Sequence, residues 1–224
     1  MTAPLELMRL LQMADSAFPS GSFAFSNGLE ALARDGHAAG REAVEALLRE
    51  QIAPRWLDVD RYYLAKAYGA GGDPEILDAI DFESEVTAAT PALRNASLSI
   101  GRSLLMSHAR IGTPGAAAYR ERIAASTGLG HAAVVQGALA HGAGLTLAMA
   151  EAGSLHGQLA GFISAAVRLG KIGALEAQAI LSRTLSRVAV RLEQPPPREP
   201  AGFAPLIEIA AARHHGPHAR LFAN

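Results

Sequence analysis

Two long stretches without a charged residue constrain the fold of this chain more than any other feature. They cover residues 123–150 and 152–167. Their length would admit a membrane-spanning helix. However, Gln136, His131 and His141 interrupt the first stretch, and alanine and glycine favour membrane insertion far less than leucine or isoleucine does. We therefore predict a pair of central helices buried by the rest of the molecule, and no membrane span.

Small residues recur one helical turn apart inside the first of these stretches. Ala133 precedes Gly137 by four positions, and Ala138 precedes Gly142 by four. Residues four apart lie on the same face of a helix, so this spacing predicts that neighbouring backbones approach closely there.

The remaining sequence also favours helices over strands. It is rich in alanine and leucine, only 5% of it is aromatic, and no segment alternates apolar and polar residues over six or more positions. We predict an all-α, single-domain bundle of about ten helices. Pro54 is expected to break one helical run into two. The predicted helices cover residues 4–14, 28–35, 41–53, 54–69, 74–89, 91–110, 115–126, 129–151, 154–169, 174–193 and 203–213.

Composition excludes several classes of protein. The chain has no cysteine, so a thiolate zinc site, an iron–sulfur cluster and a cysteine nucleophile are excluded. The net charge of −1 argues against a nucleic-acid binder, which would carry an excess of basic residues. The first 16 residues contain acids and no long apolar core, so no secretory leader is expected and a cytoplasmic location is predicted.

A proline-rich segment divides the chain near its C-terminal end. Residues 194–200 read QPPPREP, which cannot continue a helix and predicts an extended spacer. We expect a helical body over residues 1–193, including a loop at residues 15–28, and a tail over residues 201–224. Because the tail carries six large apolar residues, we expect it to dock on its own body or on a partner.

Charge is distributed unevenly. Residues 58–85 hold eight acids, whereas residues 86–140 hold five arginines and one glutamate. Such patches either pair within the fold or steer partners. Within the helix predicted over residues 174–193, Arg183, Arg187 and Arg191 recur every four positions, which predicts either a solvated face or an electrostatic docking surface.

Histidines supply the main alternative function. His214, His215 and His218 form an HHxxH pattern, and histidines one helical turn apart can share a metal ion. Together with His131, His141 and His156, they leave open a metal-binding metallochaperone or a metal-dependent helical enzyme. Gly216 and Pro217 interrupt the pattern, which argues against a helical metal site.

The loop at residues 15–28 is aromatic as well as rich in glycine and serine. It places Phe18, Phe23 and Phe25 within eight positions. Such aromatics either insert into the protein's own core or form an exposed anchor for a partner, since aromatic and arginine side chains dominate interface binding energy.

Four segments resemble a known family in order along the chain. Residues 10–36 (LLQMADSAFPSGSFAFSNGLEALARDG) resemble the N-terminal signature of the UreF family of urease accessory proteins. The matching positions there are Leu11, Ala14, Asp15, Ser16, Ala17, Pro19, Gly21, Phe23, Ser26, Gly28, Leu29 and Glu30. The other three segments are LRNASLSIGRSLL at 93–105, AAVRLGKIGALEAQAIL at 165–181, and ARLF at 219–222 with His214 upstream.

The chain departs from the family pattern at several positions. Phe25 stands where the family usually has histidine, and Ser20 replaces an isoleucine. Lys171 and Ala174 replace a proline and a glutamine, and His215 replaces a glutamate. The changes at 171 and 174 put any partner contact made there in doubt, whereas the fold is expected to tolerate them.

The resemblance implies an all-helical accessory protein without catalytic activity and without a cofactor of its own. It implies pairing with UreD (also called UreH), recruitment of the GTPase UreG to apo-urease, and a homodimer within that complex. Nickel is then cargo of the assembled complex, delivered in a step coupled to GTP hydrolysis. The partner-binding residues expected on this basis are Phe23, Phe25, Asp15, Ser16, Glu30, Arg220, Leu221, Phe222 and His214.

Overall fold

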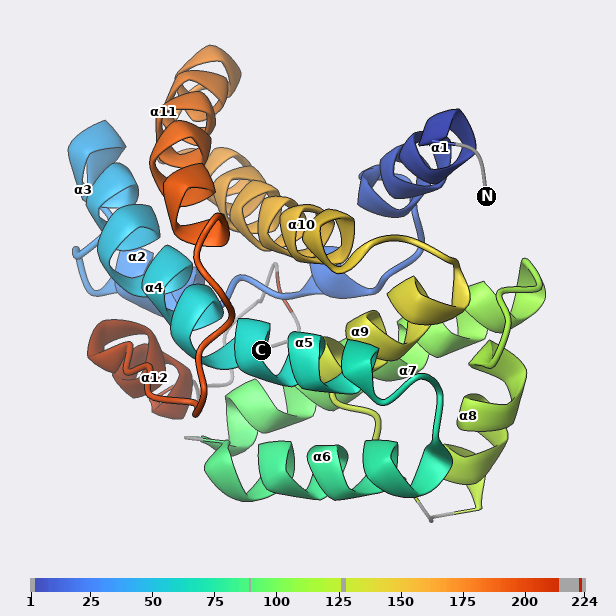
Figure 1. Ribbon diagram of the computed structural model, residues 1–224. Helices are drawn as coiled ribbons and strands as arrows, with labels where there is room; N and C mark the ends of the chain where they lie inside the picture. Colours follow the sequence, from blue (N-terminus) through green and yellow to red (C-terminus); the bar gives the residue numbers. More distant parts are fainter. Residues whose placement is uncertain (1–2, 89, 126–127, 214–221, 223–224) are drawn as a thin grey trace.

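The chain folds into helices joined by short loops, as seen in a computed structural model that describes residues 3–88, 90–125, 128–213 and 222 (Figure 1). No β-strand occurs within these residues, which confirms the predicted all-α fold. The helices outside the run from Gly40 to Gly69 are α1 (Ala3–Ala14), the short 3-10 turn η1 (Ser22–Ala24), α2 (Leu29–Arg34), α6 (Pro74–Thr87), α7 (Pro91–Arg110), α8 (Ala116–Ala124), α9 (Ala132–Gly142), α10 (Leu147–Arg168), α11 (Ala174–Leu192) and α12 (Pro205–Ala212).

The predicted break at Pro54 is wrong. One unbroken helical run passes through it, made of α3 (Gly40–Leu47), η2 (Leu48–Ile52), α4 (Ala53–Arg55), η3 (Trp56–Asp60) and α5 (Arg61–Gly69). The segments η2 and η3 are π-helical. Proline normally disrupts a helix because its ring meets the carbonyl four residues earlier. The wider π-helical turns on either side give the ring room, so the chain continues in the right-handed helical region.

The boundary between the two charge-free helices also lies elsewhere than predicted. Helix α9 ends at Gly142 and α10 begins at Leu147, whereas the sequence suggested a break near residue 152. Gly144 has a φ of +71°, and its N–H donates to the carbonyl of His141 at 2.9 Å. Thr146 then caps α10, because its hydroxyl accepts a hydrogen bond from the Met149 N–H at 3.3 Å.

Helix α10 crosses the middle of the molecule (Figure 1). It packs against α11, α9 and α1, and its buried side chains include Leu155, Leu159 and Phe162. A second apolar cluster lies among α5, α6, α7, α8 and α9. The face of α10 toward α1 carries small residues, so the N-terminal segment can lie close to it.

An ion pair at the centre joins three distant segments. Arg61 donates from Nε and Nη2 to the Glu151 carboxylate at 2.9 and 3.0 Å, and both side chains are buried. The same guanidinium donates to the carbonyls of Arg191, Leu192 and Gln194, at 3.0, 3.2 and 2.7 Å. It therefore also satisfies carbonyl groups at the C-terminal end of α11 that have no partner within that helix.

Most of the acidic run pairs inside the fold. Glu83 contacts Lys66, Glu85 contacts Arg94, and Asp78 contacts Arg122. The arginines of α11 do the same, because Arg183 pairs with Glu45 at 2.7 Å and Arg191 with Asp58 at 2.9 Å. Two arginines of that series thus dock α11 on the run from Gly40 to Gly69 rather than facing solvent alone. The lowered pKa of Glu45, caused first by its hydrogen bonds from Arg183, fits this arrangement.

The C-terminal segment returns to the body of the protein. The Ala201 N–H donates to the carbonyl of Asp58 at 3.1 Å, and α12 packs against α2, α7 and η2. Ile207 and Ala210 are buried in the same apolar cluster as α10. The predicted docking of this segment therefore occurs, on the chain's own body, at residues 205–212.

The glycine spacing in α9 makes a testable prediction. A Cβ at Gly137 would lie 2.2 Å from the Leu64 carbonyl oxygen, so α5 and α9 touch through their backbones. Gly137→Ala is expected to lower the free energy of unfolding by about 2 kcal/mol because the helices must separate. Gly157→Ala on α10 is the matched control, since a Cβ there meets nothing within 4 Å and alanine favours helix.

Urea denaturation of both variants checks this prediction. A lower midpoint concentration of urea at an unchanged slope of the transition shows a loss of stability. Equal stability of Gly137→Ala and the wild type would show that α5 and α9 do not pack this closely.

No helix within the described ranges is both long enough and apolar enough to cross a membrane.

Candidate partner-binding surface

The loop at residues 15–28 is fixed onto α7. The Ser107 hydroxyl donates to the Pro19 carbonyl at 2.9 Å, and the Phe18 ring lies 5.1 Å from the His108 ring. Gly21 has a φ of +76°, and a Cβ there would lie 2.7 Å from the Ser103 hydroxyl oxygen. These contacts hold the loop in one path over α7 and leave its tip at Phe23 facing outward.

Phe23 joins the two ends of the chain through an arginine. The guanidinium carbon of Arg168 lies 3.9 Å from the centre of the Phe23 ring and 4.2 Å from the centre of the Phe222 ring. Phe23 is 49% exposed, whereas Phe222 is 4% exposed. Burial lowers the pKa of Arg168 from its ordinary value. The structure thus places an arginine between two aromatic rings, which is a cation–π stack. We call Phe23, Arg168 and Phe222 the cation–π stack.

An apolar helix face lies beside the loop. On α1, Leu5, Leu7, Met8 and Leu11 are exposed, and no residue of this helix is fully buried. Leu10 points the other way, toward α10, where a Cβ at Gly153 would meet its Cδ1 at 2.6 Å. A helix that is apolar on its outward face as well is typical of a protein-binding site.

Small residues of α10 leave a hollow under the loop. A cavity of about 360 Å³ lies between residues 13–23 and the α10 positions Gly157, Ala160, Gly161 and Ser164. It borders Phe23, so the cation–π stack and this hollow belong to one surface.

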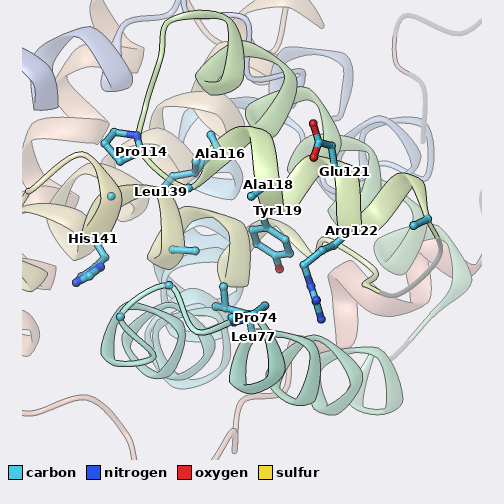
Figure 2. A pocket seen from close by; sticks show the side chains of 16 residues that line it. Pro74, Leu77, Pro114, Ala116, Ala118, Tyr119, Glu121, Arg122, Leu139 and His141 are labelled. Carbon is cyan, nitrogen blue, oxygen red and sulfur yellow. The ribbon is translucent and has the colours of Figure 1, made fainter.

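A larger cleft lies on another side of the molecule. It has a volume of about 740 Å³ and lies among α8, α9 and the turn before α6 (Figure 2). Its lining is mostly apolar, with Leu77, Ala116 and Leu139 among the residues. The Tyr119 hydroxyl at its edge donates to buried Asp81 at 2.6 Å, and Arg122 is paired with Asp78. These polar groups thus stabilise the packing of α6 against α8.

The predicted site residues of the loop occupy different environments. Asp15 and Ser16 are exposed, and the Asp15 carboxylate accepts a hydrogen bond from the Ala17 N–H at 2.7 Å, which starts the loop. Phe25 is only 9% exposed, so its ring points inward, and Glu30 is partly buried on α2. The loop aromatics therefore divide, with Phe23 outward and Phe25 inward.

Part of the predicted site lies outside the described residues. This holds for His214, Arg220 and Leu221, and also for His215 and His218 of the HHxxH pattern. Among the described residues, no group of three or more histidine, aspartate or glutamate side chains could hold a metal ion. His131 is buried against Glu85 and Ser97, while His141 lies on the surface against Tyr68. The metal-binding alternative remains a prediction that no observation here favours.

Sequence reasoning missed Arg168. It is the arginine of the AAVRL segment, so the resemblance contained a signal, but nothing in the sequence places it between residues near opposite ends of the chain. Arg168 lies at the end of α10, and this position is where Phe23 and Phe222 come together.

His108 makes the attachment of the loop sensitive to acid. Burial lowers the pKa of His108 from 6.5 to about 4, and its Nδ1 lies 2.8 Å from the Thr113 hydroxyl oxygen. Well above pH 6.5 the histidine is neutral in both states. As the pH falls from 6.5 toward 4, the unfolded chain binds a proton that the folded chain excludes. Stability is then lost by up to about 3 kcal/mol.

Unfolding measured between pH 7 and 4 checks this prediction, with His108→Phe as the comparison because it cannot titrate. The wild type should lose more stability than the variant over this window. Parallel pH profiles would show that His108 does not contribute.

Comparison with known proteins adds to this geometry. A model of the UreF family matches residues 38–185. A protein of Trichodesmium erythraeum (strain IMS101) called urease accessory protein UreF is 31% identical, over 98% of this chain and 97% of that protein. Proteins with the same description from Haemophilus influenzae (strain PittGG) and Rhizobium meliloti (strain 1021) are each 28% identical; they cover 97% and 96% of this chain, and 95% of their own length.

Proposed function

Because the chain belongs to the UreF family of urease accessory proteins, we propose that it is the adaptor that pairs with UreD and recruits the GTPase UreG to apo-urease. Members of this family are accessory proteins in urease maturation rather than enzymes. In the proposed complex, nickel is cargo and GTP is hydrolysed on UreG. The adaptor regulates that hydrolysis by binding the nucleotide states of UreG unequally, because only a difference in affinity can couple the two events.

The observation that carries this proposal is the surface on which the two ends of the chain meet. Three features follow one another along residues 3–23. They are the apolar face of α1, the hollow under the loop, and the exposed side of the cation–π stack at Phe23. Arginine and aromatic side chains at the centre of such a surface dominate interface binding energy. A surface of this composition supports binding to proteins.

The C-terminal segment has two parts in this proposal. Residues 205–212 stabilise the body, since Ile207 and Ala210 lie in its core. The partner-binding role is assigned to the residues that follow, including Arg220 and Leu221. Phe222, expected from the sequence to contact a partner, is buried and supports the surface through its stack with Arg168. We further propose that the adaptor works in the cytoplasm and forms a homodimer within the complex.

Copurification tests the proposal. The full chain, coexpressed with UreD and UreG, should elute with both from a size-exclusion column. A truncation after Arg213 should weaken the complex; it removes one core residue, Phe222, whereas deletion from Ala201 would also remove Ile207 and Ala210. Separate elution of the full chain from both partners would contradict the proposal.

A further inference from the structure

The arginines between residues 86 and 140 fall into two groups. Arg94 and Arg122 pair with carboxylates of α6. Arg102, Arg110 and Arg120 are exposed, and none of the three forms an ion pair with another described residue. The unpaired arginines of residues 86–140 therefore lie on α7 and α8.

Two of these arginines share one face of α7 with a methionine. Arg102, Met106 and Arg110 are spaced by four residues, which places them within about 80° around the helix and along about 12 Å of its length. Met106 is 42% exposed. We call these three residues the α7 stripe. Arg120 adds a further positive charge on α8, which packs along α7.

The α7 stripe borders the loop of the candidate surface. Ser103 and Ser107, which contact Gly21 and Pro19 of that loop, directly follow Arg102 and Met106 in the chain. Consecutive helical positions differ by about 100° around the axis, so the stripe lies next to the residues that hold the loop.

The chemistry of the stripe fits an acidic protein surface. Arginine binds carboxylates through two parallel hydrogen bonds, and methionine and arginine are both enriched at protein interfaces. A nucleic-acid site would require a wider basic surface, whereas α7 and α8 contain no lysine and the chain has a net charge of −1.

We propose that the α7 stripe steers a carboxylate-bearing surface of a protein partner onto the loop at residues 15–28. This inference rests on the proposed adaptor function and adds the charge of the partner surface. Opposite charges raise the rate of association more than they raise final affinity, and salt screens the effect.

Association rates test the inference. The full chain carrying Arg102→Glu and Arg110→Glu is compared with a control carrying Arg34→Glu and Arg41→Glu, which makes the same change in net charge on α2 and α3. Each chain is bound to immobilised UreD, UreG and apo-urease at low and at physiological salt. With one of these components, the stripe variant should associate roughly tenfold more slowly at low salt, and the gap should narrow as salt rises. The control should match the wild type.

Other outcomes overturn the inference in distinguishable ways. Equal association rates for the stripe variant and the control with all three components would show that the stripe does not steer a partner, while leaving the adaptor function intact. Loss of retention on heparin or on phosphatidylserine vesicles, with unchanged protein association, would assign the stripe to sulfate or phosphate groups instead. If the wild-type chain binds none of the three proteins, the proposed adaptor function is contradicted, and this inference with it. If the stripe variant misfolds by circular dichroism, Arg102→Gln with Arg110→Gln provides the same test with a smaller decrease in rate.

Discussion

Arg61→Met is expected to lower the free energy of unfolding by about 4 kcal/mol. The substitution leaves the Glu151 carboxylate buried without its partner and removes the donor from three carbonyls at the end of α11. A buried charge without a partner costs far more than the pair contributes when it is intact. Chemical denaturation of the purified variant measures the loss.

Two further variants separate the effect of the buried charge from the effect of the lost hydrogen bonds to the α11 carbonyls. Arg61→Met with Glu151→Leu should recover only part of the lost stability, because no charge is then left buried but the hydrogen bonds to the three carbonyls stay lost. The double variant should remain below the wild type by about 1 kcal/mol for each lost hydrogen bond to a carbonyl. Lys66→Met, which breaks the partly exposed pair with Glu83, should cost no more than about 1 kcal/mol. A cost for Arg61→Met as small as that for Lys66→Met would show that the central ion pair is hydrated.

Phe23→Ala combined with Arg168→Ala is expected to weaken the complex with UreD and UreG by roughly a thousandfold, or about 4 kcal/mol, from two central interface residues. Both side chains lie at the surface, so their loss removes little of the core. The melting temperature of the isolated chain should stay close to that of the wild type. Isothermal titration against the partner complex, together with a thermal melt, makes both measurements.

Phe82→Ala provides the matched control for this double variant. Phe82 is another exposed phenylalanine, on α6, which lies on the opposite side of the molecule from α1 (Figure 1). Its truncation should leave the affinity unchanged. If Phe82→Ala weakens the complex as much as the double variant does, the partner surface has been placed on the wrong side.

The helical fold could be predicted from the sequence because local signals agree with it. Asp73 followed by Pro74 marks the start of α6, and the Asp73 carboxylate accepts hydrogen bonds from the N–H groups of Glu75 and Ile76. The close approach at Gly137 was likewise predictable, since the one-turn spacing of small residues places them on one face.

The helix boundaries that were predicted wrongly from the sequence depend on tertiary contacts. Gly153 resembles a helix end, but it lies inside α10 because Leu10 of α1 packs against it. Helix α9 instead ends at Gly142, and the turn before α10 passes through Gly144 to the cap residue Thr146, neither of which stands out in a stretch with many small residues. Pro54 continues a helix only because π-helical turns surround it, and those turns have no sequence signature.

The candidate site could be predicted only in its parts. The loop and its aromatic residues are visible in the sequence, but whether Phe23 or Phe25 points outward depends on how the loop lies on α7. The cation–π stack requires residues 23, 168 and 222 to meet, and no local pattern encodes a contact over such separations.

Reconstituted activation of urease tests the adaptor function most directly. Apo-urease, UreD, UreG, nickel and GTP are mixed with the wild-type chain, with the Phe23→Ala and Arg168→Ala double variant, or with neither, and urea hydrolysis is followed. We predict activation with the wild-type chain, and little above background with the double variant or without the chain. Equal activation in the absence of the chain would contradict its role as the adaptor.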